Sequence, residues 1–501
     1  MSFRKGSLLL MGAYLITKVL GFIFRMQFVR IAGEESVGVY MAVYPAFIFF
    51  LAAIQLGLPV GVAKMTAIHT AENRLGRATD AYLAALKWVV ISSAIFVPIF
   101  FYAIPYLMTE LLQQSAAIQV GYAALIMAPI TAVATLARAY FQGLTRMSET
   151  ATSQILEQAI RILLVTFLLP YALTSTPHGM AVLAMLIALV AELVGLFYLW
   201  IRYKAVRVKG TGKPYPHKAL LTPSLPASGS KLFGSFTWFL EPVLFLHALT
   251  RSGMAVAQAT SLYGIISGVL VPMLLFPSFI PYALATVLIP AVSGAAASGR
   301  MTLVRDRVHL ALRISAVTGV LSSTLLYVYG GELAELFFHT DKMTVYFHLL
   351  SPIFFFYYIQ SPLFSILQAM DASHIAFRNS VLGGIGKLAL LAALTADVSF
   401  KEQGAVLAIG FGVLITSGLH IASIRSIRSL EVGYLTFLPV YLIFLVGIAL
   451  LPVLIPPSLP LIAQVAIGAC LLLFILIVTR QLHVKDIALT WHLLKVSVKS
   501  I

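Results

Sequence analysis

Charged residues are scarce in this chain of 501 residues: they make up 10% of it, against 60% hydrophobic residues. A soluble domain of this length needs a far more polar surface. Cysteine is nearly absent as well, and the single Cys470 excludes intrachain disulfides and metal sites of the cysteine type. These shortages argue against a soluble globular enzyme and indicate a protein of the lipid bilayer.

Sequence signatures of catalysis are also missing. The chain has no HExxH, GxSxG, Walker or paired-cysteine motif, and no polar stretch long enough to form a nucleotide-binding domain. The eleven histidines are scattered, mostly in loops. We therefore expect no catalytic residues, no metal site, no cofactor and no enzymatic activity.

Long apolar stretches separated by short loops make up most of the sequence. Each is close to the roughly 20 residues that a helix needs to cross a bilayer. We expect about fourteen transmembrane helices, at 7–30, 38–67, 81–106, 117–143, 152–174, 179–203, 227–250, 262–292, 307–330, 343–368, 375–396, 403–425, 434–456 and 459–480. The predicted fold class is an all-α polytopic membrane protein.

Lysine and arginine are concentrated in every second loop. With the N-terminus in the cytoplasm, the cytoplasmic segments hold 26 of these residues and the outer loops and helix ends hold five. This asymmetry follows the positive-inside rule, so we expect a multi-pass protein of the cell membrane with both termini cytoplasmic. The net charge of +16 is then explained by attraction to anionic membrane lipids. Nucleic-acid binding is not expected, because the basic residues are dispersed. The first apolar segment is too long for a signal peptide, and we expect it to be retained as a helix.

One basic, Pro- and Gly-containing stretch, 204–226, separates two halves that resemble each other. An offset of 223 residues aligns Gly6-Ser7 with Gly229-Ser230, Phe22 with Phe245 and Tyr40 with Tyr263, and an offset of 226 aligns Gln142 with Gln368 and Arg161 with Lys387. We expect two duplicated six-helix lobes of the same orientation, as in transporters built from parallel repeats. The predicted domains are an N-terminal lobe (1–203), a cytoplasmic linker (204–226), a C-terminal lobe (227–426), and two extra helices with a basic tail (427–501).

Several cations lie inside or at the ends of the predicted helices, where a charge costs roughly 2.5–3.5 kcal/mol at the bilayer centre. Lys18, Gly21 and Arg25 share one face of the first helix, and Arg30 follows at its outer end. This pattern predicts a cavity that binds an anionic headgroup.

The seventh span carries a carboxylate, Glu241, at the position that the 223-residue offset pairs with Lys18. Two interpretations stay open: a structural ion pair between the lobes, or a group that binds a coupling ion, H⁺ or Na⁺.

In the fifth span Glu157 and Arg161 are i, i+4 neighbours, so a simple intrahelical pair competes with a functional role. Lys387, the repeat mate of Arg161, has no acid within its own span. Glu192 has no obvious partner, and a buried hydrogen bond competes with a functional role there. Arg251 lies at the outer end of the seventh span and either contributes to the site or snorkels to the headgroups. The candidate substrate-binding residues are Lys18, Arg25, Arg30, Arg161, Arg251 and Lys387, and the candidates for the coupling ion or the interlobe pair are Glu241 and Glu157.

Five stretches resemble the stage V sporulation protein B family, which is similar to the lipid II flippases. They are KVLGFIFRMQFVRIAGEESVGVYMAVYP (18–45), QLGLPVGVAK (55–64), RAYFQGLTRMSETATSQILEQAIRI (138–162), FLEPVLFLHAL (239–249) and ATSLYGIISG (259–268). That family belongs to the multidrug/oligosaccharidyl-lipid/polysaccharide flippase superfamily.

The resemblance implies two six-helix bundles with two added helices and alternating access to a cationic cavity. It also implies a polyprenyl-pyrophosphate-linked sugar as substrate, with its tail left in lipid. Lipid II flippases carry required arginines in the first helix, and Lys18 and Arg25 lie at or next to those places. Their second-helix arginine has no counterpart in PAFIFFLAAIQLGLP (45–59).

Two other functions remain open on the sequence alone. A cation-coupled multidrug exporter of the same superfamily is one, although it would favour intramembrane carboxylates over cations. A non-transporting scaffold of an envelope-synthesis complex, in contact with cell-wall polymerases, is the other.

Overall fold

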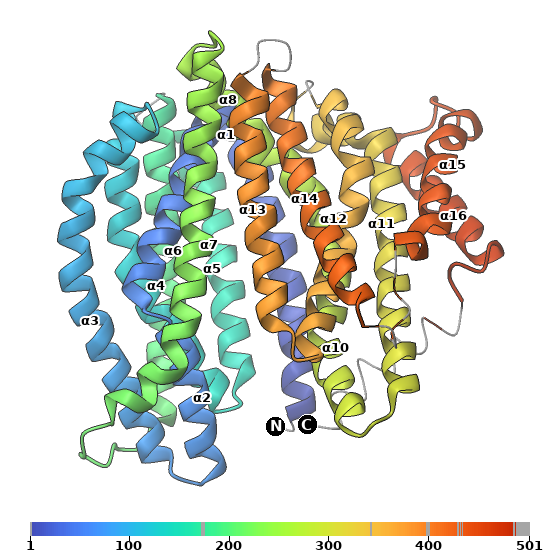
Figure 1. The fold of residues 1–501 in the computed structure, drawn as a ribbon. Coiled ribbons are helices and arrows are strands. Elements are labelled where there is room, and N and C mark those ends of the chain that lie inside the picture. Colours follow the sequence, from blue (N-terminus) through green and yellow to red (C-terminus); the bar gives the residue numbers. More distant parts are fainter. Residues whose placement is uncertain are drawn as a thin grey trace. The chain divides into compact units, whose positions relative to one another are not determined.

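The computed structural model describes residues 3–171, 176–340, 343–396, 401–427 and 434–483, together with 430, 432 and 486. Every regular element among these residues is a helix, which confirms the predicted all-α fold class. The chain divides into two compact units, Met1–Gly268 and Val269–Ile501 (Figure 1). Each unit is described by itself below, as unit 1 and unit 2.

The described residues of unit 1 form eight α-helices. They are α1 (Phe3–Gln55), α2 (Leu58–Ala71), α3 (Leu75–Tyr106), α4 (Ile118–Gly143), α5 (Met147–Leu168), α6 (Pro177–Val206), α7 (His217–Arg251) and α8 (Val256–Ile265). Helix α1 packs against α4, α5, α6, α7 and α8, so it is the central element of the unit. The predicted boundaries of the two lobes, at residues 203 and 227, stay a prediction. Unit 1 extends beyond residue 227 and includes α7 and α8.

Helix α1 is two limbs that fold back on each other at Gly33. This glycine has φ 79° and ψ 167°, a conformation that is essentially restricted to glycine. In a straight helix the twelve residues from Phe28 to Tyr40 would span about 18 Å. The ring centroids of Phe28 and Tyr40 are instead 5.3 Å apart in an edge-to-face contact. The two limbs are therefore antiparallel neighbours, and both are visible in blue in Figure 1.

The second limb of α1 packs very closely on α8. A Cβ added to Gly38 would lie 2.0 Å from the carbonyl oxygen of Thr260, and one added to Gly264 would lie 2.3 Å from that of Glu34. Small residues at helix interfaces allow such backbone contact within membranes, where dispersion and weak polar contacts drive packing. The glycines thus fix the position of α8 against α1.

The linker between α6 and α7 is shorter than the sequence suggests, because α6 continues to Val206 and α7 begins at His217. The linker is held on α2 and α3: the Tyr215 hydroxyl lies 2.9 Å from His69 Nε2, and the backbone N–H of Thr211 donates to Asp80 Oδ2 over 3.2 Å. Tyr215 is buried, which raises the pKa of its hydroxyl above its ordinary value. The basic linker is therefore an ordered part of unit 1.

The described residues of unit 2 also form eight α-helices. They are α9 (Val271–Leu275), α10 (Phe279–Ala297), α11 (Met301–Phe338), α12 (Thr344–Ala369), α13 (Ser373–Ala396), α14 (Lys401–Arg425), α15 (Leu438–Leu454) and α16 (Leu461–Val478). Helix α12 packs against α10, α11, α13 and α14, while α15 and α16 pack against α11. One hydrophobic core of buried side chains runs along α10, α11, α12 and α15, with Phe355, Ile359 and Phe444 fully buried.

Twelve helices within the described residues are long and apolar enough to cross a membrane, so the predicted count of fourteen is not confirmed. The two limbs of α1 together form one of these twelve spans, Leu15–Gln55. Helix α15 has 17 residues and is not among them. The predicted span 38–67 is interrupted at Leu56 and Gly57, both of which have positive φ, and its C-terminal part becomes α2. The protein is a multi-pass membrane protein.

Candidate functional site: a buried arginine–glutamate cluster

Three arginines and two glutamates gather among the membrane-spanning helices of unit 1. We call Arg25, Arg138, Glu157, Arg161 and Glu192 the arginine–glutamate cluster; they come from α1, α4, α5 and α6. All five lie inside candidate membrane spans. Each charge is costly in lipid, so their association needs a physical account.

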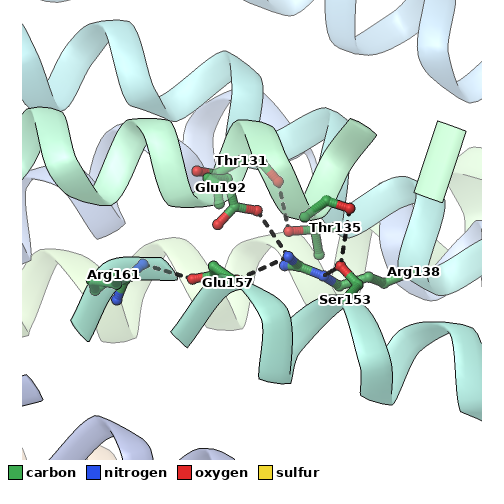
Figure 2. Close-up of polar contacts among 8 residues, drawn as sticks. Thr131, Thr135, Arg138, Ser153, Glu157, Arg161 and Glu192 are labelled. Atoms are coloured by element: carbon green, nitrogen blue, oxygen red, sulfur yellow. Dashed lines mark hydrogen bonds and ion pairs between the residues drawn. The ribbon is translucent and has the colours of Figure 1, made fainter. Parts of the chain in front are cut away.

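Arg138 joins two glutamates from different helices. Its Nη2 donates to Glu157 Oε2 over 3.0 Å and forms an ion pair with Glu192 Oε1 at 3.1 Å (Figure 2). The three side chains are buried, with 11%, 10% and 3% of their surfaces exposed. A single guanidinium is therefore shared by two carboxylates, and its charge offsets part of their mutual repulsion in a medium of low dielectric constant.

Small polar residues orient the Arg138 side chain. Its Nε donates to the Ser153 hydroxyl over 3.4 Å, and that hydroxyl donates to the carbonyl oxygen of Gly195 over 3.3 Å. The nearby Thr135 hydroxyl donates to the carbonyl oxygen of Thr131, which satisfies it within its own helix (Figure 2). Helices α4, α5 and α6 are thus joined by one polar network.

Arg161 extends the cluster towards α1. Its Nη2 donates to Glu157 Oε1 over 2.6 Å, so the sequence-based i, i+4 pair is present. The guanidinium carbon lies 5.6 Å from the centre of the Phe24 ring on the first limb of α1. Its Nε–H is buried and has no hydrogen-bond partner among the described residues. Arg161 therefore keeps a donor that a negatively charged group can use.

Arg25 lies one residue from Phe24 on the same limb. Its Nη1 donates to the carbonyl oxygen of Ser267 over 3.1 Å. Both Arg25 and Arg161 act electrostatically on the hydroxyls of Tyr40 and Tyr44, so the two cations face the same part of the second limb. With three arginines against two glutamates, the cluster carries one positive charge in excess.

The remaining candidate residues are not members of the arginine–glutamate cluster. Lys18 and Arg30 are exposed on the first limb of α1, and Arg251 is exposed at the end of α7. Glu241 is half-buried on α7 and acts electrostatically on Tyr263 of α8. Both members of the predicted pair Lys18–Glu241 thus belong to unit 1, and their pairing stays a prediction.

Lys387, the repeat mate of Arg161, belongs to unit 2. It is half-buried on α13, and its stem packs on α14 at Gly412, where an added Cβ would lie 2.8 Å from the lysine Cβ. Its role as a substrate-binding residue stays a prediction.

Arg138 is the functional candidate that sequence reasoning missed. It lies near the end of a predicted span and was counted among the cytoplasmic cations of the positive-inside pattern. The signal that points to it is Glu192 in span six. Glu157 can be assigned Arg161, but Arg202, the cation of span six, lies ten residues from Glu192 and is too far along the helix to pair with it, so Glu192 needs a cation from another helix.

These features define a class: a multi-pass, all-helical membrane protein with a buried charge network, in a fold shared with solved transporters. The structure resembles an inward-facing multidrug resistance MATE family transporter of the MOP superfamily, with a TM-score of 0.68 and 15% sequence identity. The likeness covers 82% of this chain and 94% of that one. At this identity it shows the fold alone.

Sequence comparison gives the family. Residues 3–296 match the polysaccharide biosynthesis protein family. Stage V sporulation protein B of Bacillus subtilis (strain 168) is 32% identical over 444 residues, which cover 86% of this chain and 85% of that protein. The chain belongs to the polysaccharide biosynthesis protein family. The lipid II flippase MurJ of the same organism is 23% identical over 81% of this chain and 79% of its own length. The resemblance inferred from the five sequence stretches is confirmed.

Proposed function

We propose that the protein is a flippase that moves a polyprenyl-pyrophosphate-linked oligosaccharide across the cell membrane by alternating access, and that it is not an enzyme. The observation that carries the proposal is the excess positive charge of the arginine–glutamate cluster, with a buried donor of Arg161 left unsatisfied. A pyrophosphate that leaves water needs such donors to replace its hydration. Family membership and the similarity to a lipid II flippase support the same substrate class.

In this proposal Arg25 and Arg161 hold the pyrophosphate in unit 1. Lys18, Arg30 and Arg251 attract the anion from exposed positions of unit 1, and Lys387 is a separate substrate-binding candidate of unit 2. The polyprenyl tail stays among the surrounding membrane lipids. Both termini face the cytoplasm, where the basic segments lie, and cell-wall polymerases are the expected users of the product.

Glu241 is the proposed carboxylate for a coupling ion, H⁺ or Na⁺. Glu157, the other candidate, accepts hydrogen bonds from two arginines, one at each carboxylate oxygen. A carboxylate held this way is a poor ion ligand, because the ion would have to displace a guanidinium. We therefore assign Glu157 to the structure of the cluster and keep Glu241 for coupling.

A multidrug exporter is the second candidate, because the solved structure with the TM-score of 0.68 is a multidrug transporter. A cationic drug needs a carboxylate to bind, and Glu157 and Glu192 are both paired with Arg138. The charge of the cluster therefore favours an anionic substrate.

Proteoliposomes test the two functions directly. The purified chain should flip a fluorescent polyprenyl-pyrophosphate oligosaccharide and should not accumulate a cationic dye. Arg25→Gln should reduce flipping at least tenfold, whereas Lys64→Gln, a control at an exposed lysine of α2, should leave it unchanged. Transport of the dye with no flipping of the lipid would favour the exporter, and neither activity would favour the scaffold.

A further inference from the structure

Unit 2 contains a cavity of about 340 Å³ between α10, α12, α13 and α14. This volume is at the lower end of the range for small-molecule sites, so it suits one small ring rather than an extended ligand. The cavity opens to the surface of the unit at Tyr282 and Thr286, which are both exposed. Its lining is Tyr282, Ala285, Thr286, Ile289, Gln360, Ser361, Phe364, Ser365, Gln368, Ser380, Thr416 and His420.

The chemistry of this lining is polar but uncharged. Among the described residues that form it there is no aspartate, glutamate, lysine or arginine. A phosphate would need cations and a cationic drug would need a carboxylate, since burying an unpaired charge is costly. Hydroxyls, two amides, an imidazole and aromatic rings remain. They suit a neutral ligand that has both hydrogen-bonding groups and an apolar face.

Gln360 is fixed in the wall of the cavity. Its Nε2 donates to the carbonyl oxygen of Val413 over 2.9 Å and to the Ser417 hydroxyl over 3.0 Å, so both amide protons are used. The Ser417 hydroxyl in turn donates to the carbonyl oxygen of Phe356 over 3.1 Å. The carbonyl Oε1 is then the atom that Gln360 can offer a ligand, as an acceptor.

His420 is the complementary group on α14. It is 1% exposed, and its Nδ1 lies 3.4 Å from the amide nitrogen of Asn379. That amide nitrogen also donates to the carbonyl oxygen of Leu419 over 3.1 Å and to the Ser423 hydroxyl over 2.9 Å, so its two protons have closer acceptors than His420. The neutral imidazole offers one donor and one acceptor nitrogen. The ring packs edge-to-face on Phe364, with centroids 5.9 Å apart. An imidazole and an aromatic ring thus lie together in the cavity wall.

We propose that this cavity is a carbohydrate subsite that binds one neutral sugar ring of the lipid-linked substrate. Sugar hydroxyls would accept from and donate to the fixed amide, hydroxyl and imidazole groups, while the apolar C–H face of the ring packs on Phe364 or Tyr282. The inference rests on the proposed function and deepens it, because it names the part of the substrate, one neutral sugar, that the uncharged cavity of unit 2 recognises.

Equilibrium binding to the purified full chain tests the subsite with two ligands that differ only in the sugars. One is polyprenyl pyrophosphate carrying a disaccharide, and the other is polyprenyl pyrophosphate alone. Gln360→Leu should weaken binding of the sugar-bearing lipid about fivefold to tenfold, the effect of about one lost hydrogen bond to a buried group. Binding of the sugar-free lipid should change by less than twofold.

Two further variants keep the result interpretable. Thr286→Val is nearly isosteric and lies at an exposed position, so it should fold and weaken only the sugar-bearing lipid, by about threefold. Gln464→Leu is the matched control: this glutamine lies on α16, outside the cavity, and donates to the carbonyl oxygen of Leu459. It should affect neither ligand.

Each outcome separates the two proposals. If the wild-type chain binds and flips the sugar-bearing lipid but Gln360→Leu and Thr286→Val leave its affinity unchanged, the subsite is wrong and the flippase function stands. Equal weakening of both ligands would also overturn the subsite. If the wild-type chain binds neither lipid, the proposed function fails and the subsite fails with it.

Discussion

Arg138 is the residue whose removal should damage the protein most. Within the part of the chain that the structure describes, it forms the ion pair with Glu192 and is one of two arginines that pair with Glu157. Arg138→Gln leaves two buried carboxylates close together without their shared cation, and breaking a buried pair in this way costs about 3–5 kcal/mol. We expect a clearly lower midpoint of thermal unfolding in detergent and reduced expression.

A second variant tests whether the stability lost in Arg138→Gln comes from the missing charge or from the changed shape of the side chain. Arg138→Gln combined with Glu192→Gln removes one charge of each sign, so it should recover a large part of the stability that Arg138→Gln loses. Arg251→Gln, at an exposed position, is the control and should be neutral. A double variant as unstable as the single one would contradict the electrostatic account.

Lys18 and Glu241 call for a charge swap. Both belong to unit 1, on helices α1 and α7 that pack against each other. If they form an ion pair, Lys18→Glu with Glu241→Lys should express better than either single change. A purely structural pair predicts that the swap also restores flipping. If Lys18 binds the pyrophosphate, expression should return and flipping should not. Single variants with normal expression and flipping would show that neither residue matters.

Sequence reasoning at this scale succeeded where partners are close along the chain. The Glu157–Arg161 pair follows from helical spacing alone and is present at 2.6 Å. The link from Arg138 to Glu192 joins residues 54 positions apart on different helices, and no local pattern encodes it. The contact of Arg161 with Phe24 likewise depends on how α1 packs on α5.

At the scale of elements, the contact of α1 with α8 can be tested through its glycines. Gly264→Ala places a methyl group 2.3 Å from the carbonyl oxygen of Glu34, which forces the backbones apart. Overpacking of this kind costs about 1–3 kcal/mol, so the melting temperature should fall.

Gly294 provides the matched control on α10. An added Cβ there meets nothing within 4 Å, so Gly294→Ala should raise stability by about 0.5–1 kcal/mol through helix propensity. The two substitutions are chemically identical and are expected to have opposite signs. A stabilising effect of Gly264→Ala would show that the close approach of α1 and α8 does not exist in the membrane.

The helices themselves were largely predictable, because apolar length is encoded locally. The predicted spans 434–456 and 459–480 correspond to α15 (Leu438–Leu454) and α16 (Leu461–Val478). The points at which a helix is interrupted are harder to predict from hydropathy. The turn at Leu56 and Gly57 lies inside an apolar run, and only the backbone conformation of these two residues ends the helix there.

At the scale of the whole molecule, the orientation of the chain in the membrane can be tested. The sequence places 26 basic residues on one side and five on the other, and such a bias sets the orientation of a polytopic protein. The linker between α6 and α7 should then be cytoplasmic and the turn between α7 and α8 should be outside. Lys213 and Ala255 are exposed positions in these two segments.

Single cysteines at these two positions make the orientation measurable. Cys470 is the one native cysteine, so Cys470→Ser provides a background without thiols. In intact cells a membrane-impermeant maleimide should label Ala255→Cys within minutes and leave Lys213→Cys unlabelled until the membrane is permeabilised. Both variants should label equally after permeabilisation, which controls for reactivity. The reverse pattern in intact cells would invert the topology. It would then place the basic linker outside, and the cationic route proposed for the pyrophosphate would run from the wrong side of the membrane.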